Sequence, residues 1–191
     1  MPKLLFLSGS ARQDSINQKM AATAAKIAAD QGAEVTLITL KDYEMPLYDG
    51  DFEADNGLPE NALRLKKLFI EHDGFFIASP EYNSAYSALL KNALDWISRV
   101  HEENEPFLSA FRGKVAALGA MSPGPMGGLR GLTPLRMLLG NISVHVVPSQ
   151  TALQAKPDTF SEQGYISDDQ SLNMLGSTIA EFIETTTALK S

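Results

Sequence analysis

A short apolar segment that runs directly into a small polar loop constrains this chain more than any other feature. Leu4 to Leu7 is a continuous apolar run of strand length, which is typical of a central parallel strand covered on both faces. Gly9 follows, and we expect it to let the backbone turn sharply at the carboxyl end of that strand. A helical pattern begins at Ser15. The stretch therefore predicts a buried strand, a tight loop and a helix in direct succession.

The loop in this stretch has the composition of a phosphate-binding site. It carries hydroxyls, an amide and a cation whose planar guanidinium matches phosphate oxygens: Ser8, Ser10, Ser15, Asn17 and Arg12. Ser15 stands three residues before Gln18, which is the spacing of a capping box at a helix start. Unpaired N–H groups and the positive end of the helix dipole then lie beside the loop and favour a bound phosphate.

Two interpretations of this loop stay open. A Gly-x-Gly-x-x-Gly loop would need glycines at positions that here hold Ala11 and Ser15 or their neighbours. A P-loop would need a Gly-Lys-Ser/Thr end, which is absent. A dinucleotide-binding Rossmann site and an ATPase are therefore disfavoured. The loop is either a phosphate cradle of another type or a polar turn before a capped helix with no ligand. Arg12 and the surplus of hydroxyls favour the cradle, because capping does not need them.

The rest of the chain alternates between helix-like and strand-like segments. Helices are expected at 15–31, 58–71, 87–99, 129–139 and 168–189, and further strands at 34–40, 73–79, 114–121 and 141–147. We expect a helix cap at Gly32 and irregular connections at 41–57 and 148–164. The pattern leaves open whether Pro134 begins a helix or kinks one.

This alternation predicts an α/β fold of three layers. Right-handed crossovers with helices on both faces give a doubly wound, five-stranded parallel sheet in the order 2-1-3-4-5. The carboxyl ends of strands 1, 3 and 4 then meet at the topological switch point, where ligands bind. We expect residues 1–191 to form this one domain.

Charge and residue content exclude several classes of function. The formal net charge is −7 with a pI near 4.9, which argues against a nucleic-acid partner held by its phosphates. Absence of cysteine excludes thiol catalysis and thiolate metal sites. No metal site is predicted, because the acidic alternation at 49–55 lacks an EF-hand's glycine and final glutamate and the histidines are scattered. Without a signal-peptide pattern or a membrane-length apolar run, we expect a cytoplasmic protein with no membrane partner.

Four motifs follow one another at or just after the expected strand ends. They are Gly9-Ser10-x-Arg12-x-x-Ser15-x-Asn17, Ser79-Pro80-Glu81-Tyr82-Asn83, Leu90-Lys91-Asn92-Ala93-Leu94-Asp95-Trp96 and Ser122-Pro123-Gly124-x-x-Gly127-Gly128. Together they resemble the NAD(P)H-dependent FMN reductase family, which has the flavodoxin-like fold. The resemblance runs from about Leu4 to Arg136. It departs from the family at Ser87 and Ala88, where a Pro-Gly pair is usual.

The resemblance implies an FMN site at the switch point. The FMN phosphate is expected at Ser10, Arg12, Ser15 and Asn17 and at the backbone of Ile16, and the isoalloxazine ring against Pro80, Glu81, Tyr82, Asn83 and Ser84, with Ser122 and Gly124 approaching from the next loop. Gly127 and Gly128, near a helix start, add positive potential. We interpret Lys91, Asn92 and Asp95 as structural. No residue is assigned as a catalytic acid or base, because the cofactor performs the chemistry.

The resemblance also implies an oxidoreductase that passes electrons from NADH or NADPH through FMN to a small-molecule acceptor. The acceptors considered are a quinone, an azo compound, a metal oxyanion and free flavin, and a homodimer or homotetramer is expected. Two alternatives are a flavodoxin-like electron carrier without nicotinamide activity and a binding or scaffold protein that has lost the flavin. Arg12 favours the reductase over the carrier, because flavodoxins more often have a Thr-rich first loop without an arginine.

Overall fold

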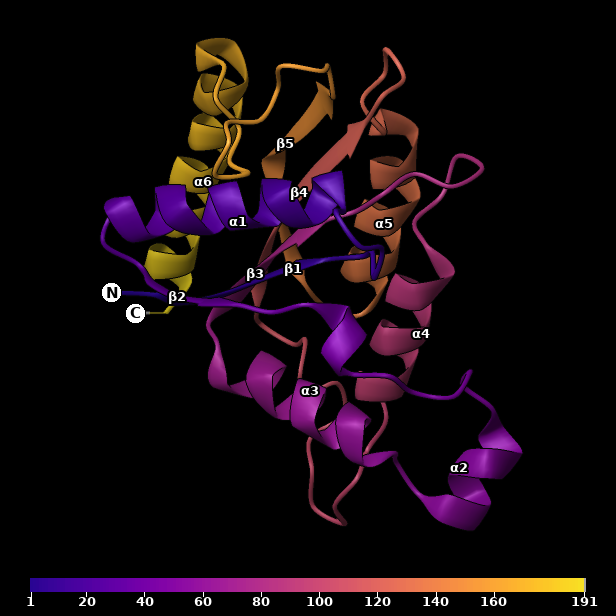
Figure 1. The fold of residues 1–191 in the computed structure, drawn as a ribbon. Helices are drawn as coiled ribbons and strands as arrows, with labels where there is room; N and C mark the ends of the chain where they lie inside the picture. Colours follow the sequence, from indigo (N-terminus) through magenta and orange to yellow (C-terminus); the bar gives the residue numbers. More distant parts are fainter. Residues whose placement is uncertain (191) are drawn as a thin grey trace.

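Five parallel strands form one sheet between two layers of helices (Figure 1). The computed structural model of the protein describes residues 1–190. The strands are β1 (Lys3–Ser8), β2 (Glu34–Leu37), β3 (Gly74–Ala78), β4 (Val115–Ser122) and β5 (His145–Gln154), and they pair in the order β2-β1-β3-β4-β5. The helices are α1 (Ile16–Asp30), α2 (Gly50–Asn56), α3 (Glu60–Glu71), α4 (Ala88–Ile97), α5 (Leu129–Asn141) and α6 (Asp169–Leu189), with a 3-10 turn η1 (Leu40–Asp42). The predicted fold class and strand order are confirmed.

Side chains of each central strand alternate between two hydrophobic cores, one on each face of the sheet. Leu5 and Leu7 of β1 belong to the core beneath α3, α4 and α5, whereas Leu4 and Phe6 belong to the core beneath α1 and α6 (Figure 1). Each of these four side chains is at most 1% exposed. Because helices cover both faces, the strand is apolar along its length rather than alternately apolar and polar. Within residues 1–190, no helix combines the length and apolar character that a membrane crossing needs.

Helix α1 begins and ends where the sequence indicates. The Ser15 hydroxyl accepts a hydrogen bond from the Gln18 N–H at 3.3 Å, as an N-cap does. Gly32 follows the helix with φ of +89°, and the hydrogen bonds around it are those of a Schellman motif. The second bond of the predicted capping box is absent, because the Gln18 side chain donates instead to the Ile38 carbonyl at 3.1 Å. Gln18 therefore ties α1 to the end of β2.

The sequence pattern places the last strand at 141–147, but β5 runs from His145 to Gln154. The sequence pattern ends the strand before Pro148, because proline cannot donate to the ladder of hydrogen bonds in a sheet. The pairing with β4 shifts register at this point, and the Arg136 guanidinium donates to the carbonyl oxygens of Val146, Val147 and Pro148 at 3.3, 2.8 and 3.2 Å. An edge strand can continue past such a bulge when another group satisfies its carbonyls. In α5, Pro134 lies inside the helix.

The sequence predicts an irregular connection at 41–57. The structure differs, because this acidic stretch contains α2 and most of η1. The Asp49 carboxylate caps α2 by accepting from the N–H groups of Asp51 and Phe52 at 2.9 and 3.0 Å. Thr39 caps η1 in the same way, which ends β2 at Leu37 rather than at residue 40. Helix α2 stands away from the sheet and has no buried residue (Figure 1). Among residues 1–190 no group of acidic and histidine side chains could hold a metal ion.

Helix α4 holds this connection through the motif that we interpret as structural. Asn92 accepts from the Tyr48 N–H at 2.8 Å and donates to the Pro46 carbonyl at 2.9 Å. Lys91 and Asp95 form an ion pair one turn apart on the same helix. The interpretation is confirmed for Asn92, which ties its helix to a neighbouring loop.

A buried ion pair fastens the connection between α4 and β4 to α3. Lys66 and Glu105 contact each other, with side chains 5% and 12% exposed. Lys66 also donates to the Arg99 carbonyl at 2.5 Å, and Glu105 accepts from the Ser109 hydroxyl and from the His101 N–H. Burial by itself raises the pKa of Glu105, but the hydrogen bonds from Lys66, Ser109 and His101 outweigh it and lower the pKa to about 2.

We expect Glu105→Gln to lower the free energy of unfolding by roughly 3 kcal/mol at neutral pH, because Lys66 becomes an unpaired buried charge. The folded-state pKa of Glu105 lies below its ordinary value of 4.5. The stability that Glu105 adds to the folded protein is therefore complete above pH 4.5 and is lost as the pH falls toward 2. Urea unfolding should show the difference between wild type and variant shrinking over this range. Glu102→Gln, at an exposed neighbour, is the control, and a pH-independent difference would contradict the assignment.

Candidate functional site

A hollow of about 210 Å³ lies at the carboxyl ends of β1, β3 and β4. This is the topological switch point of a sheet with this strand order. The loops that follow the three strands surround the hollow, which we name the switch-point pocket. Its lining residues are Ser10, Arg12, Asp14, Ser15, Ile16, Asn17, Pro80, Glu81, Tyr82, Met121, Ser122 and Pro123.

Serine hydroxyls hold the β1–α1 loop in shape. Ser8 accepts from the Ser10 N–H at 3.2 Å, Ser10 from the Arg12 N–H at 3.3 Å, and Ser15 from the Gln18 N–H at 3.3 Å. Each hydroxyl thus uses an acceptor position inside the loop and retains its O–H group to donate elsewhere. Ser10, Ser15 and Arg12 line the pocket, and the first N–H groups of α1 have no acceptor within the helix. The loop therefore has the donor arrangement of an anion cradle, and we name it the cradle.

Gly9 has a different role from the turn that the sequence suggests. The residue of this loop with a left-handed backbone is Asp14, at φ of +54°. A Cβ atom on Gly9 would lie 3.2 Å from Leu90 Cβ and 3.2 Å from Pro80 Cδ. Gly9 therefore allows α4 and the β3–α4 loop to pack closely against the cradle.

Asn17 joins the cradle to the end of β4. Its amide donates to the Met121 carbonyl at 2.9 Å and accepts from the Met121 N–H at 2.9 Å, and the residue is 3% exposed. Both ends of the amide are therefore engaged by the main chain of β4. The Asn17 side chain positions two walls of the pocket against each other, and its backbone N–H lies in the first turn of α1.

The β3–α4 loop ends in a tight turn. Asn83 and Ser84 have φ of +53° and +65°, and the flanking Tyr82 and Ala85 exchange N–H to carbonyl hydrogen bonds of 2.9 and 3.1 Å. Two central residues with positive φ are typical of a type I′ turn, for which Asn is a favoured residue. The turn places Asn83 and Ser84 at its tip and leaves Pro80, Glu81 and Tyr82 to line the pocket.

Glu81 links this loop to α5. Its carboxylate is 8% exposed and accepts from Arg130 Nε at 2.8 Å and from the Gly131 N–H at 3.3 Å. The acidic side chain is therefore committed to a contact within the protein.

Glycines start α5 in the loop after β4. Gly127 and Gly128 have φ of +61° and +90°, and Gly128 is the N-cap of the helix. A Cβ atom on Gly127 would lie 2.6 Å from the backbone nitrogen of Leu153, so glycine is required there. The predicted helix start at these glycines is confirmed, and the positive end of the α5 dipole begins in the loop that borders the pocket.

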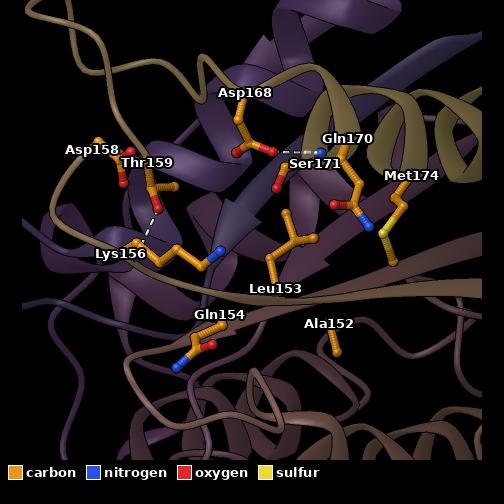
Figure 2. A pocket seen from close by; sticks show the side chains of 10 residues that line it. All are labelled: Ala152, Leu153, Gln154, Lys156, Asp158, Thr159, Asp168, Gln170, Ser171 and Met174. Atoms are coloured by element: carbon orange, nitrogen blue, oxygen red, sulfur yellow. Dashed lines mark hydrogen bonds between the residues drawn. The ribbon is translucent and has the colours of Figure 1, made fainter.

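A second hollow, of about 280 Å³, lies between the end of β5 and the start of α6 (Figure 2). Lys156 and two carboxylates, Asp158 and Asp168, belong to its walls. Figure 2 shows Asp168 bonded to the Ser171 N–H, at 2.8 Å, so the protein itself supplies the anion at the start of α6. An anionic cofactor would meet both carboxylates there, and we therefore take the switch-point pocket as the candidate cofactor site.

The structure brings most of the predicted cofactor residues together. Asn83, Ser84 and Gly124 lie outside the lining of the pocket, and their contact with a cofactor stays a prediction. Sequence reasoning did not single out Asp14, Met121 and Pro123. Asp14 reaches the pocket through its left-handed backbone, which the sequence does not signal, and Pro123 is marked only by its place in the Ser122-Pro123-Gly124 motif.

A doubly wound sheet with an anion cradle after β1 and two further loops at one switch point defines a flavodoxin-like cofactor-binding protein. Comparison with known families makes the class specific. The family model for NADPH-dependent FMN reductase matches residues 2–158. The chain therefore belongs to the NADPH-dependent FMN reductase family. The predicted class, an oxidoreductase that uses FMN and a nicotinamide donor, is confirmed.

Individual relatives agree with this assignment. A quinone reductase of Escherichia coli K12 is 34% identical over 137 residues, which are 72% of this chain and 69% of the relative. An NAD(P)H-dependent FMN reductase of Pseudomonas aeruginosa is 30% identical over 91% of this chain and 89% of the relative. The solved structure of FerB, a flavoenzyme NAD(P)H:(acceptor) oxidoreductase of Paracoccus denitrificans, has a TM-score of 0.84 and 26% identity and covers 98% of each chain.

We expect Asn17→Asp to lower the free energy of unfolding by roughly 2 kcal/mol, because a carboxylate has no proton to donate to the Met121 carbonyl. Urea unfolding at neutral pH measures the change. Asn61→Asp is the control, because the Asn61 amide makes a similar bond, at 2.9 Å to the Glu44 carbonyl, on the exposed surface. Equal losses in the two variants would show that the Asn17 bonds do not hold the pocket walls.

Proposed function

We propose that this protein is a quinone reductase that uses NADPH or NADH and holds FMN in the switch-point pocket. The observation that carries the proposal is the convergence of donors in the lining of the pocket: the hydroxyls of Ser10 and Ser15, the Arg12 guanidinium and the N–H groups of Ile16 and Asn17 at the start of α1. The quinone reductase of Escherichia coli supports a quinone as the acceptor. The other acceptors expected from the sequence can replace the quinone in the same assay.

The chemistry of the lining fits FMN. Its phosphate carries only acceptor oxygens at neutral pH, and the cradle offers donors of the kinds that bind phosphate. Within residues 1–190, no ion pair or side-chain hydrogen bond engages the Arg12 guanidinium, which leaves its fork available. Asp14 is an acidic side chain of the lining, but it is exposed, so solvent and salt weaken its repulsion of an anion.

The rest of the pocket orients the cofactor and admits the acceptor. Bound FMN supplies the hydride and electron chemistry. Pro80 and the backbone of the β3–α4 loop form one wall, held in place through Glu81, and Ser122 and Pro123 form another. Tyr82 is 48% exposed at the pocket and offers an aromatic surface to a flat acceptor. In this proposal no side chain of the protein acts as an acid or base.

The test is an absorbance spectrum of the protein after reconstitution with FMN, followed without oxygen. We expect retained flavin bands that bleach when NADPH or NADH is added and return when benzoquinone follows. Bands that persist with both donors would favour the electron carrier. A protein that retains no flavin would refute the proposed function and favour the alternative of a binding or scaffold protein.

A variant of the cradle sharpens this experiment. Arg12→Leu should weaken FMN binding by at least about tenfold, because it removes a charge-assisted contact to the phosphate. Riboflavin, which has the same ring but no phosphate, should bind wild type and variant equally. Arg64→Leu, on the exposed part of α3, is the matched control. Equal losses of affinity for FMN and riboflavin would show that Arg12 does not contact the phosphate.

We also propose that the protein forms a homodimer or a homotetramer. Leu129 and Met137 are 40% and 63% exposed and lie two turns apart on α5, with Met126, 49% exposed, just before the helix. Such an apolar stripe on a helix is typical of a surface that another protein covers. Sedimentation equilibrium should give two or four chains per particle. Met137→Lys should raise the dissociation constant of the oligomer. A monomer at all concentrations would refute this proposal.

A further inference from the structure

We propose that Ser87 is a positioning residue of the cofactor site: its hydroxyl fixes the peptide unit that carries Ser10 and so orients the phosphate cradle. The inference rests on the proposed function, because it concerns how the cradle receives the FMN phosphate. Ser87 does not line the switch-point pocket. It acts through Gly9 and Ser10.

The peptide unit between Gly9 and Ser10 is held at both ends. The Ser87 hydroxyl donates to the Gly9 carbonyl at 2.5 Å, and the Ser10 N–H donates to the Ser8 hydroxyl at 3.2 Å. Ser8, Ser10 and Ser87 are 0%, 6% and 3% exposed. Rotating this unit would break both bonds where water does not reach to replace them, so each bond protects the other. The direction of the Ser10 side chain is thereby set.

Ser87 also joins two loops of the site through a single oxygen. The same hydroxyl accepts from the Leu90 N–H at 3.1 Å and is the N-cap of α4. On the other side of the contact, the Gly9 N–H donates to the Ala78 carbonyl of β3 at 3.0 Å. The start of α4, the end of β3 and the cradle are therefore linked at Gly9. A proline at position 87 would have no hydroxyl to make this link.

Three substitutions at Ser87 separate its two roles. Ser87→Gly removes the bond to Gly9 but remains a tolerable N-cap, since Gly costs a helix start little. Ser87→Ala removes both the bond and the cap, and Ser87→Thr retains a hydroxyl for both. Asp168→Ala is the matched control, because Asp168 caps α6 away from the cradle and its loss costs capping alone.

The first readout is the dissociation constant of FMN beside that of riboflavin, measured by quenching of flavin fluorescence. We expect Ser87→Gly and Ser87→Ala to weaken FMN about tenfold, the size of one lost hydrogen bond, and to leave riboflavin unchanged. Ser87→Thr and Asp168→Ala should bind FMN like wild type. Unchanged FMN binding in Ser87→Gly, or an equal loss for both ligands, would overturn the inference.

The second readout does not need the cofactor. Amide hydrogen exchange of Ser10 in the flavin-free protein should accelerate by at least about tenfold in Ser87→Gly, because the peptide unit loses one of its two anchors. The Ser177 region of α6 should exchange as in wild type. Unchanged exchange at Ser10 overturns the role of Ser87 even if wild type binds FMN. Conversely, faster exchange in a protein that retains no flavin supports the positioning role and refutes the proposed function.

Discussion

Burial of the sheet on both faces is the constraint on which the rest of this structure depends. A polar side chain along β1, β3 or β4 would be enclosed by one of the two cores, where an unpaired polar group is costly. Polar chemistry is therefore confined to the strand ends. Ser8 marks the limit: it ends β1, is fully buried, and uses its hydroxyl on the Ser10 N–H. Only beyond it do side chains become free to meet a ligand.

The same constraint explains which parts of the fold the sequence predicts. Apolar strands covered on both faces leave runs such as Leu4–Leu7, and these runs mark the central strands of a sheet joined by right-handed crossovers. The end of β5 has no such run, because the strand passes Pro148 with help from Arg136, a side chain of α5 that the pattern of the strand itself does not reveal. The sequence pattern also fails to reveal helix α2, for the opposite reason. None of its residues is buried, so only the cap at Asp49 marks it, and carboxylates also suit a solvated loop.

The members of the candidate site follow from the sequence better than their roles do. Residues that come directly after β1, β3 and β4 must gather at the switch point, whatever they do there. Asn17 and Glu81 are correctly expected near the pocket, yet their side chains bond Met121 and Arg130. Whether a polar group faces a ligand or another loop depends on distances between segments that are far apart in the chain. Local pattern contains no information on those distances.

The charge of the chain gives the cradle its importance. A protein with a net charge of −7 repels both FMN and a nicotinamide cofactor at long range, but such repulsion is screened beyond about 8 Å at physiological ionic strength. Attraction must then come from donors in direct contact. Hydrogen bonds act only when their geometry is right, so a chain with this charge depends on loop order more than on charge. Close packing at Gly9, where an added Cβ atom would lie 3.2 Å from both Leu90 and Pro80, and the hydrogen bonds of its N–H and carbonyl groups supply that order. We therefore expect the order of the cradle together with the Arg12 guanidinium, rather than a basic surface, to account for anion binding.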